Sequence, residues 1–126
     1  MDLNQLAKLF IQSFESRDAE AITDFCAESV LFENVASGES IHGKSLLFQM
    51  LSEFFKNVTE VSWDVHQIIA SDNKIAIERT SHIVFNANKI TIRAVAILII
   101  VNAKIKRFSD YFDAATFKNQ NRNETW

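Results

Sequence analysis

In the first half of the chain, apolar residues recur three and four positions apart, the spacing that gathers them on one face of an α-helix. Behind Asp2, a residue type that caps helix N-termini, this spacing predicts a helix to about Ser16, formed by Leu3, Leu6, Ala7, Phe10 and Phe14. A short second helix is predicted from Asp18, with an apolar side made of Ala21, Ile22 and Phe25. Adjacent apolar pairs repeat every four residues in a third helix: Leu46, Leu47, Met50, Leu51, Phe54 and Phe55.

From Val30 onward the hydrophobic period changes to two, which is the period of a β-strand. A short strand is predicted there, with Phe32 and Asn34 on the same face as Val30. Four longer runs follow the third helix, at residues 61–70, 75–85, 90–101 and 105–112, and short polar turns separate them. Turns this short join only antiparallel neighbours. The sequence therefore predicts an α+β domain in which the helices cover one face of an antiparallel sheet.

Two charged residues stand alone on apolar faces of these strands. Arg79 alternates with Ile77, Ser81, Ile83 and Phe85, and Asp110 lies between Phe108 and Phe112. A charge on an apolar face is expensive to bury unless an opposite charge pairs with it. One interpretation is therefore a buried Arg79–Asp110 ion pair in a pocket. The alternative is that both residues lie at an exposed rim in contact with water.

The run at 90–101 is apolar on both faces from Ala94 onward. Helices that cover one face of the sheet leave the other face to be covered, and Val95, Ile97 and Ile99 lie on that second face. We expect a second copy of the chain to cover it, which predicts a homodimer. The alternative is a longer sheet that curls over itself.

Length, composition and charge limit the class of protein. The 126 residues are 48% hydrophobic with a net charge of −3, so we predict one domain over residues 1–118 and a polar tail over 119–126. The dispersed basic residues argue against nucleic-acid binding. The longest apolar run and the polar N-terminus argue against a membrane helix and a signal peptide, so we expect a cytoplasmic protein. Eleven Phe residues indicate either a Phe-rich core or a pocket with flat apolar walls.

Three segments resemble a known family. Residues 102–113, which end in Asp-Tyr-Phe-Asp, resemble the final hairpin and strand of SnoaL-like proteins, members of the nuclear transport factor 2-like superfamily. Residues 32–34 and 41–44 resemble the short strand and helix start of the same family, and residues 78–81 resemble the Glu-Arg-x-Asp strand of limonene-1,2-epoxide hydrolases. The resemblance implies a cone-shaped fold, in which a curved antiparallel sheet wraps three N-terminal helices around an apolar cavity. It also implies dimers through the outer face of the sheet.

The resemblance carries over to single residues only in part. Arg79 matches the arginine of the epoxide hydrolases, Asp110 the second aspartate and Asn34 the water-binding asparagine. Ser81 stands in place of the first aspartate and Phe32 in place of the tyrosine. The loss of one carboxylate disfavours epoxide opening, which needs separate groups to accept and deliver protons. Ketosteroid isomerases carry an aspartate base where Asn34 falls, whereas SnoaL-type cyclases use an acid near the position of Asp110.

We therefore predict that the chain binds a small hydrophobic molecule, with an isomerase- or cyclase-type activity as one hypothesis. The alternatives are a non-catalytic binding module and an association domain. The candidate catalytic residues are Asp110, Arg79 and Asn34. The candidate substrate-binding residues are Ser81, Phe32, Phe108, Phe112 and Trp63, and Trp63 is expected to share its face with Val61, Val65 and Ile69. We expect no cofactor and no metal, because the three histidines have no shared spacing, and we expect Cys26 to be a buried, inert thiol.

Overall fold

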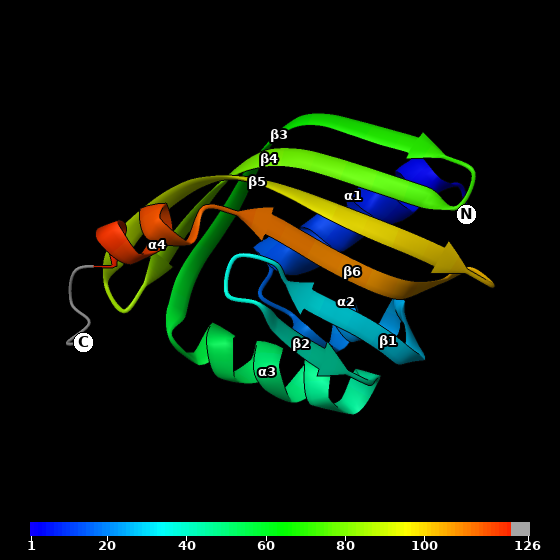
Figure 1. Ribbon diagram of the computed structural model, residues 1–126, viewed down its shortest axis with the longest axis horizontal. Helices are drawn as coiled ribbons and strands as arrows, with labels where there is room; N and C mark the ends of the chain where they lie inside the picture. The colour runs from blue at the N-terminus through cyan, green and yellow to red at the C-terminus, as the bar shows by residue number, and fades with distance from the viewer. Residues whose placement is uncertain (122–126) are drawn as a thin grey trace.

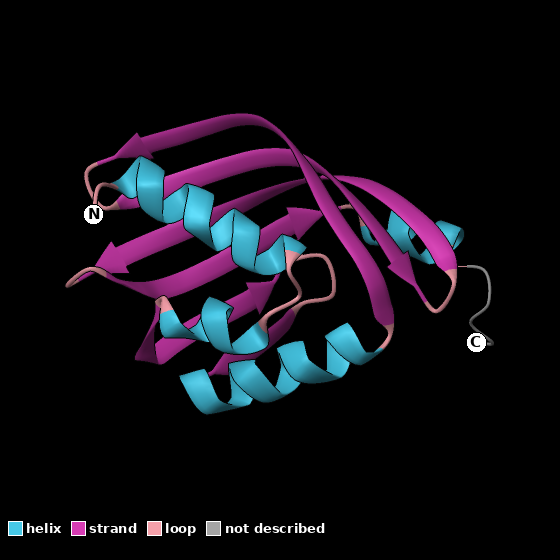
Figure 2. Ribbon diagram, turned by 180° about the vertical axis from the view of Figure 1, so that it is seen from behind, coloured by secondary structure: helices cyan, strands magenta, loops and turns pink. Residues whose placement is uncertain are grey.

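The computed structural model describes residues 1–121 as a curved six-stranded sheet with three helices on its concave face and a fourth at one end (Figure 1, Figure 2). The elements, in chain order, are α1 (Leu3–Glu15), α2 (Ala19–Asp24), β1 (Cys26–Asn34), β2 (Glu39–His42), α3 (Lys44–Lys56), β3 (Val58–Ser71), β4 (Lys74–Phe85), β5 (Asn88–Val101), β6 (Lys104–Phe112) and α4 (Ala114–Gln120). The α+β class and the three N-terminal helices are confirmed.

The strands are ordered β2-β1-β6-β5-β4-β3, and β3 to β6 form the predicted antiparallel meander. One pairing differs from the expectation of an entirely antiparallel sheet, because β1 runs parallel to β6. No short turn joins these two strands, so the turn lengths could not reveal their relative direction. This pairing places Asn34 of β1 beside Asp110 of β6, and Phe32 beside Phe108.

The local sequence explains where the first two helices begin and where the hairpins turn. The carboxylate of Asp2 accepts a hydrogen bond of 2.7 Å from the Gln5 amide, so the predicted cap of α1 is confirmed. Asp18, where the second helix is predicted to start, caps α2 in the same way and accepts a hydrogen bond of 3.0 Å from the Ala21 amide. The two hairpins that flank β5 turn at residues 86–87 and 102–103, where all four residues have positive φ. Two successive positive φ values define the tight hairpin turn that matches the twist of the strands.

The core lies between the concave face of the sheet and the three N-terminal helices. Phe10 of α1, Ile22 of α2 and Leu47 of α3 are fully buried against inward residues of the strands, among them Ile77 and Leu98. Burial of this apolar surface is what holds the helices on the sheet. No helix within residues 1–121 combines the length and the apolar character needed to cross a membrane.

Two features differ from the pattern read along the sequence. The pairing of β3 with β4 shifts by one residue between Val65 and Gln67, and such a bulge moves the following side chains to the other face. Ile69 is therefore exposed instead of sharing the inner face with Trp63, and Ile68 packs against the core in its place.

The second feature is α4, which the hydrophobic pattern of the sequence does not predict. It begins one residue after β6 and includes residues 119 and 120, which the sequence predicts as part of the polar tail. Asn121, which follows it, is buried and accepts a hydrogen bond of 3.1 Å from Asn88. The rest of the predicted tail, residues 122–126, lies outside the described residues.

Candidate functional site

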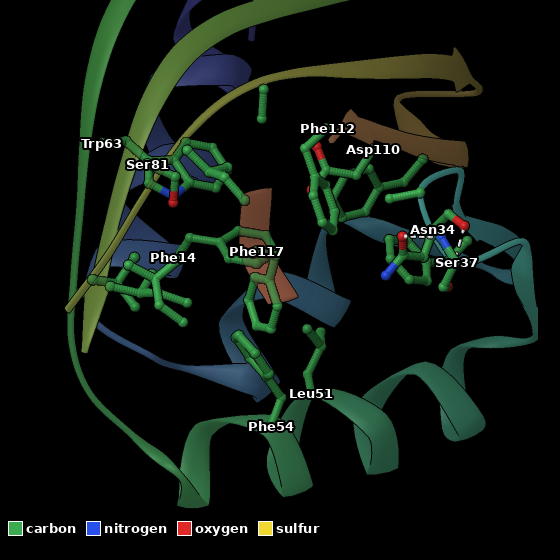
Figure 3. Close-up of a pocket in the computed structure, with 18 of the residues that line it drawn as sticks. Phe14, Asn34, Ser37, Leu51, Phe54, Trp63, Ser81, Asp110, Phe112 and Phe117 are labelled. Carbon is green, nitrogen blue, oxygen red and sulfur yellow. Dashed lines mark hydrogen bonds between the residues drawn. The ribbon is translucent and has the colours of Figure 1, made fainter. Parts of the chain in front are cut away.

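A pocket of about 510 Å³ lies between the concave face of the sheet and helices α1, α3 and α4 (Figure 3). Its walls are mainly aromatic and include seven phenylalanines: Phe14, Phe32, Phe54, Phe55, Phe108, Phe112 and Phe117. Its polar lining comes from Asn34, Ser37, Glu39, Arg79, Ser81 and Asp110. A mainly apolar cavity of this size with a few polar groups is typical of a small-molecule site.

Arg79 and Asp110 form a bidentate ion pair in the wall of the pocket. The Nη1 atom of Arg79 donates to Oδ1 of Asp110 at 2.8 Å, and its Nη2 atom donates to Oδ2 at 3.1 Å. The two side chains come from β4 and β6, on either side of β5. Across β5, Arg79 pairs with Ala94 and Asp110 pairs with Ala96. Because these two alanines are small, the charged side chains can meet over them.

Trp63 completes the surroundings of Arg79. The Cζ atom of Arg79 lies 4.0 Å from the centre of the Trp63 ring, which is within the range of a cation–π contact. The same ring stacks on Phe14 with a centroid distance of 5.0 Å. Nε of Arg79 is buried without a hydrogen-bond partner among residues 1–121. The guanidinium is therefore held by Asp110 at one edge and by Trp63 at one face.

Asn34 and Ser81 both line the pocket but lie far from each other. Figure 3 shows Ser81 next to Trp63 and Asn34 next to Ser37, on opposite sides of the pocket. The Oδ1 atom of Asn34 accepts a hydrogen bond of 3.2 Å from the Ser37 amide, so its carbonyl end holds the turn after β1. The Ser81 hydroxyl makes no hydrogen bond within the described part of the chain. A ligand would have to span the pocket to reach both residues.

All eight residues singled out in the sequence line this pocket, and several further lining residues were not anticipated. Phe54 and Phe55 come from α3, where the paired apolar spacing had suggested only a buried helix face. Phe117 lies on the unpredicted α4, and Glu39 lies at the start of β2. The excess of phenylalanine was the one sequence signal of an aromatic wall. It did not show which phenylalanines form that wall.

Further polar clusters lie on the convex face of the sheet. Glu33 accepts hydrogen bonds from the Ser109 hydroxyl at 2.7 Å and from Nη2 of Arg107 at 2.7 Å, and these two contacts lower the pKa of its carboxyl from the ordinary 4.5. His82 contacts Asp64 at 2.8 Å. Among residues 1–121, no group of three or more His, Cys, Asp or Glu side chains is arranged to hold a metal ion.

The chain thus has the architecture of a curved sheet folded around a mainly apolar pocket. Comparison with known proteins identifies the family to which it belongs. Residues 7–108 match the family model of the SnoaL-like domain, and the chain belongs to that family. No curated protein sequence matches the chain.

Solved structures with this fold include proteins that are described as different kinds of enzyme or by their fold alone. A SnoaL-like polyketide cyclase, described as putative, from Shewanella denitrificans is 14% identical, with a TM-score of 0.86 and coverage of 96% of this chain and 97% of that chain. A limonene epoxide hydrolase-like enzyme from M. tuberculosis is 17% identical, with a TM-score of 0.80 and coverage of 92% and 86%. A protein with a ketosteroid isomerase-like fold from Catenulispora acidiphila, in complex with trimethylamine, is 11% identical, with a TM-score of 0.82 and coverage of 90% and 89%. At these identities the likeness establishes the fold alone.

Proposed function

We propose that this protein binds a small, mainly apolar molecule in the pocket, with the polar part of that molecule next to Asp110. The observation that carries the proposal is the contrast between the aromatic walls of the pocket and the buried Arg79–Asp110 ion pair within them. Apolar walls supply affinity through burial of surface, and a few fixed polar groups supply orientation. The Arg79–Asp110 pair is fixed in this way by two hydrogen bonds and by the Trp63 ring.

An acid–base reaction of the isomerase or cyclase type is a second candidate function. It is favoured by the way in which Arg79 holds the Asp110 carboxylate in the pocket wall. A carboxylate in this position can take a proton from a carbon atom of the ligand and return it to another atom, so one acid–base group suffices. Ser81 supplies no second carboxylate, and for that reason epoxide opening is not proposed.

Binding can be tested with N-phenyl-1-naphthylamine, an uncharged dye whose fluorescence rises in apolar sites. We expect saturable binding to the wild-type protein. Ala94→Leu adds apolar volume inside the pocket and should weaken binding by about tenfold or more, because a filled site must be repacked before the dye can enter. The control Val95→Leu makes a similar change at the next position of β5, where the side chain points to the other face. It should leave binding unchanged.

Two outcomes would contradict the proposal. One is the absence of saturable binding to a wild-type protein that is folded by circular dichroism. The other is equal binding to wild type and to a folded Ala94→Leu variant, which would place the dye outside the pocket. Leu51→Trp, also in the lining, fills the pocket from α3 and replaces Ala94→Leu if that variant fails to fold.

We also propose that the protein forms a homodimer through the convex face of the sheet. Val95, Ile97 and Ile99 of β5 lie on that face and are half-buried within one chain. Apolar residues in a row across a sheet face favour coverage by another surface of the same kind.

A further inference from the structure

The two partners of the buried ion pair are not equally open to the pocket. The side chain of Asp110 is 16% exposed, whereas that of Arg79 is only 5% exposed. The Nη1 and Nη2 atoms of Arg79 bond to Asp110, one face of its guanidinium lies on Trp63, and its Nε atom is buried. The cation is thus enclosed by its neighbours. A ligand that approaches the pair meets mainly the carboxylate.

The Asp110 carboxylate also keeps capacity for further hydrogen bonds. Each of its oxygens accepts one side-chain hydrogen bond, both from Arg79, and no other side chain among residues 1–121 donates to either oxygen. A carboxylate has about four acceptor positions. The polar end of the pocket therefore offers acceptor positions to a ligand, and these are satisfied by donors such as N–H groups.

The net charge of the residues that line the pocket also favours a ligand that donates hydrogen bonds. Its charged residues are Arg79, Asp110 and Glu39, one positive and two negative, which gives a net charge of −1. Glu39 forms no ion pair within the described residues. The aromatic walls add to this preference, because the faces of aromatic rings attract cations. Phe112, which lies two residues after Asp110 on β6, is half-buried and lines the pocket, so an aromatic ring lies next to the carboxylate.

We propose that the pocket selects ligands in which an apolar, aromatic-sized body carries a protonated amine, and that it discriminates against carboxylates. This inference rests on the proposed binding function and names the chemical class of the ligand. The ammonium group donates to Asp110, the apolar body packs on the phenylalanine walls, and Glu39 balances the added charge. A carboxylate would instead face Asp110, while the Arg79 side chain is only 5% exposed and its Nε atom, which has no partner among residues 1–121, is buried away from the ligand.

Three probes with the same bicyclic body separate these effects: 2-naphthylmethylamine, 2-methylnaphthalene and 2-naphthoate. Their affinities for the wild-type protein are measured by calorimetry at pH 7, where the amine is protonated and the acid is ionised. We expect the amine to bind about tenfold or more tightly than the naphthoate, with the neutral hydrocarbon between them. The preference should persist in 0.5 M NaCl. Salt at this concentration strongly screens exposed charges, whereas Asp110 is largely buried.

Two variants identify the origin of the preference. In Asp110→Asn the shape is kept and the negative charge is removed, so the ratio of amine to naphthoate affinity should fall below about threefold. In Glu39→Gln an exposed charge is removed, so the ratio should fall less and the remaining preference should be insensitive to salt.

The outcomes distinguish this inference from the proposed function. Naphthoate binding equal to or tighter than amine binding in the wild type would overturn the charge preference while leaving the binding function intact. A preference that survives unchanged in a folded Asp110→Asn variant would also overturn it, because Asp110 could not then be its origin. The failure of all three probes to bind a folded wild-type protein at millimolar concentration would instead count against the proposed function itself.

Discussion

Arg79 is held by Asp110 along one edge and by Trp63 on one face, with 4.0 Å between its Cζ atom and the centre of the Trp63 ring. This arrangement joins three strands, since Trp63 lies on β3, Arg79 on β4 and Asp110 on β6. Because Arg79 is fixed from two sides, it holds the Asp110 carboxylate in a fixed position toward a ligand. It also makes the stability of the sheet depend on the ion pair.

Asp110→Asn should lower the free energy of unfolding by about 3 kcal/mol, because it leaves the buried Arg79 cation without its counter-charge. Arg79→Met leaves Asp110 unpaired and should be similarly destabilising. The double variant should lose less than the sum of the two, by about 1 kcal/mol or more. Urea unfolding of the four proteins measures this cycle.

Glu53→Gln, in the exposed pair with Lys56, is the matched control and should change stability by less than about 0.5 kcal/mol. Additive effects at Arg79 and Asp110 would contradict a coupled pair.

The hydrogen bond from Ser109 to Glu33 is the largest contribution to the lowered pKa of the Glu33 carboxyl. Removal of this hydroxyl in Ser109→Ala should raise the pKa of Glu33 toward its ordinary 4.5. A lowered folded-state pKa stabilises the fold above the ordinary value, and that stabilisation is lost as the pH falls through the folded-state pKa. The part of the stability difference between wild type and Ser109→Ala that comes from the lowered pKa of Glu33 should therefore disappear as the pH falls below the folded-state pKa.

Carbon-13 NMR titration of the glutamate carboxyls measures the pKa of Glu33 directly. Thr116→Ala is the control, because the Thr116 hydroxyl makes the corresponding bond to Asp113 and lowers the pKa of that carboxyl instead. If the pKa of Glu33 is the same in wild type and Ser109→Ala, the hydrogen bond does not set it.

Much of the candidate site follows from strict alternation along two strands. Arg79 and Asp110 are assigned to apolar strand faces because most of the residues that alternate with them are apolar. Of the two interpretations, a buried pair or an exposed rim, the structure supports the buried pair. The alternation could not reveal that Ala94 and Ala96 lie between them, since this depends on the register of three strands. The two small residues in a strand otherwise rich in Ile and Val are the signal that points to such a contact.

The remaining differences arise where the local pattern does not determine the structure. One extra residue in the bulge of β3 reverses the faces for Ile68 and Ile69, and nothing in that apolar stretch marks the shift. Helix α4 has only seven residues, and its apolar side is largely Phe117, which is too short a pattern to predict a helix. Its position depends on contacts with β5, a strand distant in the sequence.

Gln120 closes the free edge of β5 beyond the point at which β6 ends. Its side-chain amide accepts from the Thr91 amide at 2.6 Å and donates to the Thr91 carbonyl at 3.0 Å, as a neighbouring strand would. Gln120→Ala should lower stability by about 1 kcal/mol and increase hydrogen exchange at the Thr91 amide. Gln12→Ala, at an exposed position of α1, is the matched control. Unchanged protection of Thr91 would show that the side chain does not cover this edge.

Ile97→Lys tests the proposed homodimer by placing a charge in the centre of the apolar row on β5. Light scattering should give about 29 kDa for the wild type, twice the chain mass of 14.4 kDa, and the mass of a single chain for the variant. The physical reason is that apolar burial contributes about 25 cal/mol per Å² and a buried lysine without a partner opposes it. Gln12→Lys adds the same charge on α1 and should remain dimeric. A soluble Ile97→Lys variant with the mass of a dimer would refute this interface.

Cys26 should be unreactive in the folded protein, as its sequence context predicts for a buried thiol. It is 2% exposed, and burial raises the pKa of its thiol from the ordinary 9.0 to about 12. Because the thiolate is the reactive form, iodoacetamide at pH 8 should modify the native protein far more slowly than the urea-unfolded protein. The raised pKa also gives a pH dependence. Between about pH 9 and 12 the thiol ionises in the unfolded chain but not in the folded one, so the free energy of unfolding should fall with rising pH over this range.

Cys26→Ala separates this effect from the titration of lysines and tyrosine in the same range. The stability advantage of wild type over Cys26→Ala should shrink and then reverse as the pH rises from 9 to 12, because only the wild type contains the thiol that ionises on unfolding. The variant also loses the sulfur atom from a buried site, so it should be less stable at neutral pH by about 1 kcal/mol. A stability difference independent of pH, together with rapid alkylation of the native protein, would show that the thiol is accessible and titrates near its ordinary value.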